Sequence, residues 1–432
     1  MIYRIKQKLR KIVPYNFILF THKLRAVLAV LMYGSPKRKI RIIGVAGTKG
    51  KTTTTNMIAR VLEEGGHKVA MLSTANFQIG EKKWLNDKKL TSTTSFYLQK
   101  FLRKAVKEKC DYAIVEISSH GLVQFRHWGV KYKTVVLTNM MSDHLDYHKT
   151  YENYKNSHNA LLTKDLENLV INYDDENLRS FLNFEGPKKY AFSLKGYGEI
   201  ENVKLIKAED IVSKKAGLDF SVRTNKGKMP VQLPLIGEFN IYNSLAATAV
   251  GLAENIRPLA IKKALESIKN IPGRLEKIEE GQNFEVIVDY AHSPDSLRNV
   301  YTAVKPTVQN RMIAVLGGTG DRDKTYRAKG GELASEYADI VIITNEDPYS
   351  EDPEEIINQV VLGVKNKILG ETFFRIFDRK EAIQKAVDIA QTGDLVIITG
   401  KGAEQFMVCG EEKIPWDDRE IVRGALKNRR KS

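Results

Sequence analysis

The stretch Gly44-Val45-Ala46-Gly47-Thr48-Lys49-Gly50-Lys51-Thr52-Thr53 decides the fold of this chain. It follows an apolar run, residues 40–45, and precedes a helix-like run, residues 52–62. A glycine-rich loop between a strand and a helix lets backbone N–H groups and a helix N-terminus surround a phosphate. In such loops the lysine reaches the outer phosphates and the next hydroxyl binds Mg²⁺. We therefore predict that a nucleotide phosphate chain binds at Gly47, Thr48, Lys49, Gly50, Lys51, Thr52 and Thr53.

The spacing of this loop differs by one residue from the usual phosphate-loop pattern. Gly44 lies one position too early, and Val45 occupies the place of the first glycine. The alternative is an ordinary glycine turn. We favour the phosphate loop because Gly50-Lys51-Thr52 lies between a predicted strand and a predicted helix.

Composition limits the class of protein. A chain of 432 residues is long enough for two or three domains. Its two cysteines, Cys110 and Cys409, cannot build a disulfide framework, and the sequence shows no Cys/His metal spacing, which fits a reducing cytoplasm. We expect no nucleic-acid partner, because no aromatic-interleaved basic motif accompanies the positive charge.

The net charge of +16 is concentrated near the N-terminus, where fourteen Lys or Arg precede the first acid, Glu63. Residues 13–33 are apolar but contain His22, Lys23 and Arg25, and a membrane span needs about 20 mostly apolar residues, so we do not expect one. No secretory cleavage site is evident. Two interpretations of residues 1–38 stay open: an amphipathic helix packed on the protein, or a helix on an anionic membrane surface, giving peripheral contact with the inner face.

Alternating strand-like and helix-like runs predict an α/β fold, with a P-loop-type, mostly parallel central sheet over residues 39–271. Its predicted strands are residues 40–45, 68–72, 112–117, 134–138 and 168–172, and residues 203–235 suggest a shorter, β-rich insertion. A second alternating set, residues 272–432, predicts a separate Rossmann-like α/β domain. Its predicted strands are residues 286–289, 312–316, 340–344, 374–377 and 395–399.

Two polar residues follow strands of the first predicted sheet. Glu116 ends one strand, and His144 follows the next. Ligands of α/β sheets collect at the carboxyl ends of the strands, so we expect both residues beside the phosphate loop. Taken singly, each could be an ordinary loop residue; the phosphate loop makes a shared site the better interpretation.

Ordered motifs run through most of the chain. They are Gly47-Thr48-Lys49-Gly50-Lys51-Thr52, Ser118-Ser119-His120-Gly121-Leu122, Asp143-His144-Leu145-Asp146-Tyr147-His148, Gly237-Glu238-Phe239-Asn240-Ile241-Tyr242-Asn243, Pro272-Gly273-Arg274-Leu275-Glu276, Asp289-Tyr290-Ala291-His292-Ser293-Pro294-Asp295, Gly320-Asp321-Arg322-Asp323-Lys324 and Gly400-Lys401-Gly402. In this order they resemble the Mur ligase family of ATP-dependent amide-forming enzymes, and within it the ligases that add the third amino acid of the peptidoglycan stem. The resemblance covers about residues 40–426.

The resemblance implies a role for each matching position. Lys51 and Thr52 would bind the ATP phosphates and Mg²⁺, with Glu116 and His144 also contacting the metal. The nucleotide would further contact Asn240 and Asn243 at the adenine, and Arg274 and Asp289 from the second domain. Positions that hold the muramoyl peptide are Thr93, Thr94, Ser118, Gln124 and Arg126. Positions that hold the incoming amino acid are Arg322, Glu346, Asp347, Tyr349, Gly400 and Glu404.

The implied reaction joins a free amino acid to the carboxylate of a UDP-linked muramoyl peptide through an acyl phosphate, in a cytoplasmic monomer. ATP and Mg²⁺ are the implied cofactors. Two alternatives stay open. One is a Mur-like ligase for another substrate, such as a folylpolyglutamate-type or other peptide ligase. The other is a non-catalytic ATP-binding homologue.

Three features depart from the family pattern. About forty residues precede the first strand, too few for the usual uridine-binding domain, so the UDP-linked substrate stays open. The family's carbamate-bearing lysine corresponds to His158, for which we predict an active-site role; Lys155 could substitute, and the alternative is a helix-surface residue. Ligases that select meso-diaminopimelate carry Asp-Asn-Pro-Arg, whereas this chain has Glu346-Asp347-Pro348-Tyr349 and lacks the bidentate arginine, which leaves the amino acid open.

Overall fold

The structure is a computed structural model that describes residues 13–34, 39–141, 145–225 and 227–430. The chain divides into two compact units. The first contains residues 1–84 and 90–269, and the second contains residues 85–89 and 270–432. The short segment Leu85–Lys89 thus belongs to the second unit, although the chain on both sides of it belongs to the first.

The first unit is built on an eleven-stranded sheet with the order β11-β10-β9-β8-β7-β6-β1-β5-β2-β3-β4. The strands are β1 (Arg41–Ala46), β2 (Val69–Leu72), β3 (Asn76–Ile79), β4 (Lys82–Leu85), β5 (Tyr112–Glu116), β6 (Thr134–Leu137), β7 (Asn168–Asn172), β8 (Lys188–Ser193), β9 (Val203–Lys214), β10 (Gly217–Thr224) and β11 (Gly227–Leu233). Pairing is parallel from β2 through β5, β1, β6, β7 and β8 to β9. The predicted α/β class and the mostly parallel sheet are confirmed.

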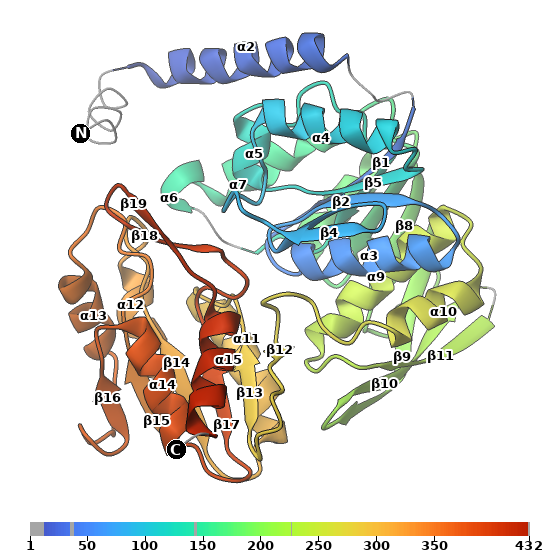
Figure 1. Cartoon of the computed structure of the whole chain (residues 1–432). Helices are drawn as coiled ribbons and strands as arrows, with labels where there is room; N and C mark the ends of the chain where they lie inside the picture. The colour runs from blue at the N-terminus through green and yellow to red at the C-terminus, as the bar shows by residue number, and fades with distance from the viewer. Residues whose placement is uncertain (1–12, 35–38, 142–144, 226, 431–432) are drawn as a thin grey trace. The chain divides into compact units, whose positions relative to one another are not determined.

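The helices of the first unit follow the alternation expected of parallel crossovers. They are α2 (Tyr15–Tyr33), α3 (Lys51–Glu64), α4 (Ser95–Lys107), α5 (Ser119–Val123), α6 (Leu145–His148), α7 (Tyr151–Ser157), η2 (His158–Leu161), α8 (Glu176–Arg179), η3 (Ser180–Asn183), α9 (Phe239–Ala253) and α10 (Pro258–Glu266). Figure 1 shows α4 and α5 on one side of the sheet and α3, α9 and α10 on the other.

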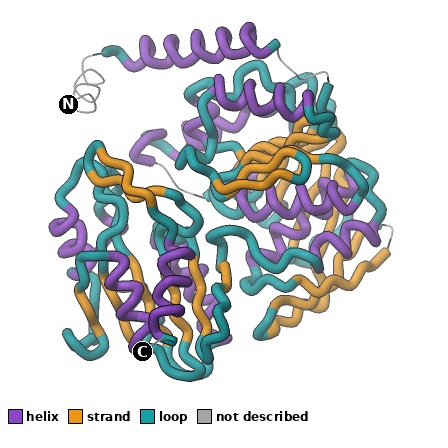
Figure 2. The backbone as a smooth tube through the Cα atoms, in the orientation of Figure 1, coloured by secondary structure: helices purple, strands orange, loops and turns teal. Residues whose placement is uncertain are grey.

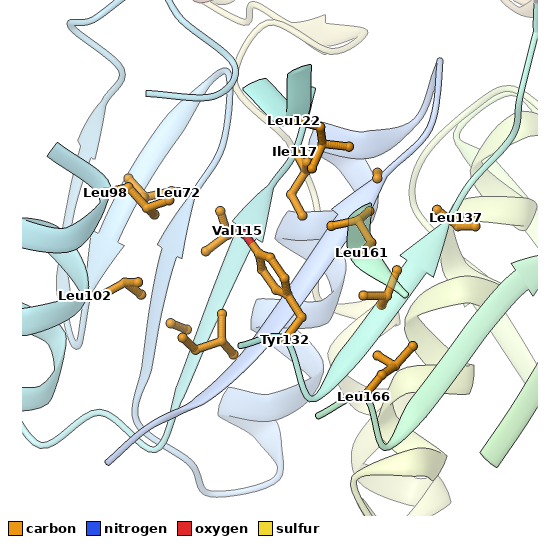
Figure 3. Close-up of a cluster of buried hydrophobic side chains, with 14 of the residues drawn as sticks. Leu72, Leu98, Leu102, Val115, Ile117, Leu122, Tyr132, Leu137, Leu161 and Leu166 are labelled. Carbon is orange, nitrogen blue, oxygen red and sulfur yellow. The ribbon is translucent and has the colours of Figure 1, made fainter. Parts of the chain in front are cut away.

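The central strands are buried on both faces, as long apolar runs in a parallel sheet predict. Every residue of β5 is buried. Val115 points into a cluster with Leu98 and Leu102 of α4 (Figure 3). Tyr132, Leu137 and Leu161 extend this cluster toward the next strand. The core therefore fixes the strand ends from which the site residues project.

Strands β9–β11 form the β-rich region expected over residues 203–235, and they belong to the main sheet. Five residues of β9 pair in parallel with β8, and β10 and β11 then continue the same sheet as antiparallel neighbours. The local sequence pattern predicted strands correctly but carried no information about which strand they would join.

The second unit has a six-stranded sheet with the order β12-β13-β17-β14-β15-β16. Its strands are β12 (Glu276–Lys277), β13 (Glu285–Val288), β14 (Met312–Leu316), β15 (Ile340–Ile343), β16 (Phe373–Arg375) and β17 (Leu395–Ile398), with a separate hairpin of β18 (Phe406–Cys409) and β19 (Glu412–Pro415). Its helices are α11 (Pro294–Val304), η4 (Lys305–Thr307), α12 (Thr325–Tyr337), α13 (Pro353–Val361), α14 (Arg379–Ile389) and α15 (Asp418–Arg429). Within the six-stranded sheet all pairs except β12–β13 are parallel, as predicted, whereas β18 and β19 pair antiparallel. Figure 2 shows the helices and strands of this unit by colour.

A fully buried ion pair joins two helices of the second unit. Arg379 begins α14 and Asp418 begins α15, and both side chains have no solvent exposure. The Arg379 guanidinium donates to the Asp418 carboxylate at 2.9 and 2.7 Å and to the carbonyl of Thr399 at 2.8 Å. The last helix is thereby tied to the carboxyl end of β17. Such a pair is costly to break, because removing one partner leaves a buried charge.

The N-terminal helix α2 packs on the first unit. Ala26 and Ala29 are fully buried, and the Arg103 guanidinium of α4 donates to the carbonyl of Tyr33 at 3.0 Å. Gly34 then ends the helix in the left-handed conformation, with φ of 70°. By length and composition alone α2 is also long and apolar enough to cross a membrane. The observed contacts agree with the first interpretation of this segment, a helix packed on the protein.

Candidate active site

The glycine-rich loop lies between β1 and α3, as predicted. Gly47 and Gly50 have φ of 128° and 80°, a region that glycine adopts without strain. A Cβ atom at Gly47 would collide with the Thr138 hydroxyl, and one at Gly50 would collide with the Asn243 amide. Gly50 is the N-cap of α3, so the first N–H groups of a 14-residue helix open directly from the loop.

Neighbouring strand ends hold the loop in place. The Lys49 N–H donates to Asn139 Oδ1 at 2.8 Å, and the Thr138 hydroxyl donates to the Lys49 carbonyl at 2.7 Å. The hydroxyls of Thr48 and Tyr154 lie 2.6 Å apart. Side chains from the end of β6 and from α7 therefore satisfy the loop's own polar groups. The loop is organised before any ligand binds, which lowers the entropic cost of binding one.

Lys51 and Thr52 stand at the start of α3. The Lys51 ammonium donates to the Thr48 carbonyl at 2.7 Å, across the mouth of the loop. The Thr52 hydroxyl donates to the Glu116 carboxylate at 3.0 and 3.1 Å. Thr74 adds its N–H and hydroxyl to the same carboxylate, at 2.6 and 2.7 Å. Glu116 is almost fully buried, and its bonds to Thr52 place it beside the loop, where β1 and β5 end. Its contact with a metal stays a prediction.

Carboxylate and hydroxyl oxygens at the foot of a phosphate loop fit Mg²⁺, which prefers hard oxygen ligands. Thr52 and Glu116 supply such oxygens. His144, the third predicted metal contact, lies outside the described residues. Within the described part of the chain, no three His, Cys, Asp or Glu residues gather into a metal cluster. The Thr52 hydroxyl and the Glu116 carboxylate are the described oxygens that suit such a cation, and metal binding here stays a prediction.

His158 is a buried histidine at the start of η2. Its side chain has no solvent exposure, so the alternative of a helix-surface residue is wrong. The Nδ1 atom lies 3.1 Å from the Tyr154 carbonyl, and Nε2 has no hydrogen-bond partner among the residues that the structure describes. Burial lowers the pKa of His158 from 6.5 to about 4, and the charges of Lys51 and His148 act in the same direction. A neutral imidazole cannot supply the negative charge of a carbamate.

Asn240 and Asn243 lie on α9, where both side chains are buried. Asn243 accepts from the Thr54 hydroxyl at 3.1 Å and donates to Asn240 Oδ1 at 3.0 Å, and Asn240 donates to the Ile236 carbonyl at 2.8 Å. These bonds brace the first turns of α3 beneath the loop. Contact of either amide with adenine stays a prediction.

The residues predicted for the muramoyl peptide converge on Ser92, which sequence reasoning missed. The Ser118 N–H donates to the Ser92 hydroxyl at 2.8 Å, and the Arg126 guanidinium donates to the Ser92 carbonyl. Gln124 Oε1 accepts from Arg126 Nη2 at 2.6 Å. Thr93 is buried, and Thr94 is the N-cap of α4. These side chains thus gather around one loop at the carboxyl side of the sheet.

The second unit contains a buried cluster of two carboxylates and two lysine ammonium groups. Asp347 accepts from Lys89 at 2.6 Å and from Lys401 at 2.9 Å, and Glu404 accepts from the same lysines at 3.1 and 3.0 Å. Burial raises the pKa of Glu404. Burial also acts on Asp347, but there the two lysines prevail and hold its pKa below the usual value. Two carboxylates and two ammonium groups balance each other in this cluster. Lys89 and Lys401 had no predicted role.

Glu346, Gly400 and Tyr349 border this cluster. Glu346 accepts from the Thr319 hydroxyl at 2.8 Å, and burial raises its pKa. A Cβ atom at Gly400, whose φ is 114°, would collide with the Glu346 carboxylate, so only glycine fits there. The Tyr349 ring faces the Lys89 ammonium at 5.5 Å. Arg322 is exposed, and its positive charge counteracts the rise in the pKa of Tyr349 that burial causes.

Arg274 and Asp289 lie together at the start of the second unit. The Arg274 guanidinium stacks over the Tyr290 ring at 4.4 Å. Asp289 accepts from the N–H groups of Leu275 and Ala291, both at 2.7 Å, and burial raises its pKa despite the charge of Arg274. Asp289 therefore shapes the Arg274 loop. Closure of either residue on a nucleotide stays a prediction.

Two family models match the chain. The Mur ligase middle domain matches residues 45–251, and the Mur ligase glutamate ligase domain matches residues 273–402. A UDP-N-acetylmuramoyl-L-alanyl-D-glutamate–2,6-diaminopimelate ligase of Clostridium botulinum is 38% identical over 409 residues, covering 94% of this chain and 82% of the relative. A UDP-N-acetylmuramyl-tripeptide synthetase of Roseiflexus is 36% identical over 421 residues, covering 93% and 81%.

A solved structure agrees with these relatives. The structure of a UDP-N-acetylmuramoyl-L-alanyl-D-glutamate–2,6-diaminopimelate ligase superposes with a TM-score of 0.65 at 31% identity, covering 94% of this chain and 83% of that one. The chain belongs to the Mur ligase family and is an ATP-dependent, amide-forming ligase. The family resemblance inferred from the ordered motifs is confirmed.

Proposed function

We propose that this chain joins an amino acid to the terminal carboxylate of a UDP-linked muramoyl dipeptide, the step that makes a muramoyl tripeptide in the cytoplasm. The observation that carries the proposal is the preorganised phosphate loop, with Lys51 at its mouth and the Thr52–Glu116 pair at its foot. The muramoyl substrate is inferred from the relatives described above, whose names state it. A carboxylate alone is a poor acyl donor, so an enzyme of this class must activate it.

The loop fits the phosphate chain of ATP, and its foot fits Mg²⁺. Backbone N–H groups of residues 47–53 would bind the phosphates, and Thr52 and Glu116 would hold the cation. When bound, ATP supplies the phosphoryl group that converts the carboxylate into an acyl phosphate, and Mg²⁺ offsets the repulsion between the two anions. Lys51 adds a positive charge, and its present bond to the Thr48 carbonyl keeps the ammonium over the loop.

His158 has a role different from that of a carbamylated lysine. Its neutral ring is buried, and the charge of Lys51 helps to lower its pKa. The Nδ1 atom of His158 contacts the Tyr154 carbonyl, and the Tyr154 hydroxyl in turn contacts the Thr48 hydroxyl of the loop. We assign His158 as a positioning residue that supports the loop through Tyr154. Its Nε2 can accept a proton or a hydrogen bond but carries no negative charge.

Recognition of the muramoyl peptide rests on the residues around Ser92. Arg126 is half-buried and already oriented by Gln124 and the Ser92 carbonyl. A fixed guanidinium suits a carboxylate, which it can bind through two hydrogen bonds. We propose that Arg126 binds a carboxylate of the peptide and that Ser118, Thr93 and Thr94 contact its polar backbone.

The incoming amino acid is assigned to the second unit, near Arg322, Gly400 and Glu404. Position 349 carries a tyrosine, which offers one hydroxyl and an aromatic face in place of a guanidinium fork. The balanced cluster of Asp347, Glu404, Lys89 and Lys401 borders it. We propose that this unit does not use an arginine clamp to select meso-diaminopimelate.

The test is amide formation by the full-length chain. UDP-muramoyl dipeptide, ATP and Mg²⁺ are combined with single amino acids, and ADP and the tripeptide are followed by a coupled assay and mass spectrometry. We expect ADP release that requires both the dipeptide and an amino acid. ATP binding without ADP release in every mixture would contradict the proposal and favour a non-catalytic homologue. ADP release with a folate acceptor instead would move the chain to another ligase class.

A further inference from the structure

The outer face of α2 carries a continuous apolar stripe. It consists of five exposed side chains: Phe17 (58% exposed), Phe20 (60%), Leu24 (48%), Leu28 (47%) and Leu31 (74%). Their spacing of three or four residues places them along one face of a helix. Exposed apolar side chains that occur singly are ordinary, but a row of this length marks an interaction site.

The opposite face of the same helix is already occupied. Ala26 and Ala29 are fully buried, and the start and end of α2 are held by Tyr15, which bonds to Tyr147, and by Tyr33, whose carbonyl accepts from Arg103. In Figure 1, α2 lies along the outer side of α4. The packing of α2 on the first unit therefore leaves the stripe uncovered and points it away from the protein.

Positive charge borders the stripe on both sides. At about 100° per residue, Lys23 and Arg25 lie roughly 100° to either side of its centre. Both side chains are exposed, and the Lys23 ammonium also lies 5.8 Å from the centre of the Phe125 ring of the first unit. For Lys23 to reach the headgroups, this weak surface contact has to be given up. No Asp or Glu occurs before Glu63, so no acid nearby in the sequence neutralises them. An apolar row flanked by cations is complementary to a bilayer whose headgroups are anionic.

We propose that α2 docks in the plane of an anionic phospholipid bilayer, with the stripe of Phe17, Phe20, Leu24, Leu28 and Leu31 in the acyl boundary and Lys23 and Arg25 among the headgroups. This inference does not depend on the ligase reaction. The apolar row lies on a convex helix surface rather than in a groove, and a bilayer can cover such a surface without a shape-matched pocket.

An orientation in which α2 spans the bilayer is disfavoured, although the helix is long and apolar enough to cross one. It would place Lys23 and Arg25 near the bilayer centre, where charged side chains are costly. The sequence on both sides of α2 is basic, with Arg10 and Lys11 before it and residues 37–39 after it, so neither flank favours translocation. Spanning would also remove Ala26 and Ala29 from their packing on the first unit.

The test uses the full-length protein and vesicles of phosphatidylcholine, alone or mixed with phosphatidylglycerol. Co-sedimentation is measured at low and high salt for wild type, for the triple variant Leu24→Gln/Leu28→Gln/Leu31→Gln and for Lys23→Gln/Arg25→Gln. A matched control replaces three exposed leucines elsewhere, Leu259, Leu362 and Leu369, by Gln; these are 70%, 78% and 70% exposed. Circular dichroism and ligase turnover in solution verify that each variant is folded.

We expect wild type to bind the anionic vesicles, to bind neutral vesicles far more weakly, and to be released by salt. The α2 triple variant should lose binding by about tenfold or more, the charge variant should lose its preference for anionic lipid, and the control should bind like wild type. Absence of binding, or equal loss in the control, overturns the proposal. Binding that survives alkaline carbonate extraction would show spanning and overturn in-plane docking, and a dimer dissolved by the α2 variant would show instead that the stripe contacts a second copy.

Discussion

The phosphate loop of the first unit and the cluster of Asp347, Glu404, Lys89 and Lys401 in the second unit stabilise buried polar groups by different interactions. Both must hold polar groups in a largely buried place. The loop does so mostly with neutral contacts, because Asn139, Thr138 and Tyr154 satisfy its backbone and hydroxyl groups. Its charged contacts, from Lys51 to a carbonyl and from Thr52 to Glu116, each pair a charge with a neutral group. The cluster does so with charge, because Lys89 and Lys401 neutralise Asp347 and Glu404.

Because of this difference, the two regions should respond differently when a ligand binds. A loop satisfied by neutral neighbours keeps its shape, so a bound anion adds its charge to a prepared site. In a cluster of two carboxylates and two ammonium groups, removing one group leaves a net charge on the other three. The net charge of the cluster should therefore determine which ligand charge it prefers. Variants of the first region should therefore change rates, and variants of the second should change selectivity.

The largest expected effect is a loss of turnover when the lysine of the phosphate loop is replaced. Lys51→Ala should reduce ADP release about a thousandfold or more, because the transferring phosphoryl group loses a fixed positive charge. The fold should remain, since the hydrogen bond from the ammonium to the Thr48 carbonyl contributes little to stability by itself. Steady-state turnover is the measurement, and Lys188→Ala, at an exposed position of β8, is the control. Retention of most turnover by Lys51→Ala would remove Lys51 from the mechanism.

The next effect concerns His158 and pH. Its pKa is about 4 in the folded chain and 6.5 for an unperturbed histidine, so the unfolded chain binds more protons between these values. Stability from the neutral buried ring is therefore complete above pH 6.5 and is lost as pH falls toward 4. At about 1.4 kcal/mol for each pKa unit, the loss is roughly 3 kcal/mol.

Denaturant unfolding near pH 5 and near pH 7 should show about 2 kcal/mol of this loss, because the rest appears only as pH falls from 5 toward 4. His158→Ala should reduce the difference between the two pH values by about 2 kcal/mol. Part of the difference should remain, because burial also lowers the pKa of His127 from 6.5 to about 3. His67→Ala, at a side chain 35% exposed, should leave the difference unchanged. His158→Ala should also lower turnover strongly, and bicarbonate should have no effect on either protein. Turnover like that of wild type would make position 158 a bystander, and Lys155 would be tested next.

A smaller effect distinguishes amino acids. Without an arginine at position 349, preference for meso-diaminopimelate over lysine should fall by about 2–3 kcal/mol relative to a clamped site. Competition of the two amino acids at equal concentration, read by mass spectrometry of the tripeptide, is the measurement. A preference for meso-diaminopimelate of about a hundredfold would show that Arg322 or a nearby lysine replaces the clamp.

The smallest effect tests whether charge balance sets selectivity. Lys89→Met leaves Asp347 and Glu404 with Lys401 alone, a net negative cluster. The ratio of kcat/KM for lysine to that for meso-diaminopimelate should then rise about tenfold, the size of one partly buried ion pair. Lys380→Met, at an exposed position, is the control. An unchanged ratio with a lower Tm would make Lys89 purely structural.

The sequence predicted best what depends on neighbours in the chain. The loop, its flanking strand and helix, and most parallel strands of both sheets follow from local apolar runs and glycine spacing. The parallel strand β8 was not predicted. The meeting of Thr52 with Glu116 was also predictable, because carboxyl ends of parallel strands share an edge.

Long-range partners could not be predicted from the sequence. Lys89 bonds to Asp347, 258 residues later, and no periodicity records such a pair. Tyr154 meets Thr48 across 106 residues for the same reason. The burial of His158 depends on how η2 packs under the loop, so its surroundings could not be inferred from spacing. Strands β9–β11 were recognised, but their continuation of the main sheet was not.

The strand order of the second unit has a consequence for synthesis on the ribosome. Strand β17 lies between β13 and β14, yet it is the last parallel strand to be made. Until residues 395–398 emerge, β13 and β14 cannot be joined, and each presents an open edge that can pair with other chains. Asp418, which neutralises buried Arg379, comes later still. The second unit therefore completes its fold only after β17 and Asp418 have both emerged, and a nascent chain stalled before β17 is the form most exposed to aggregation.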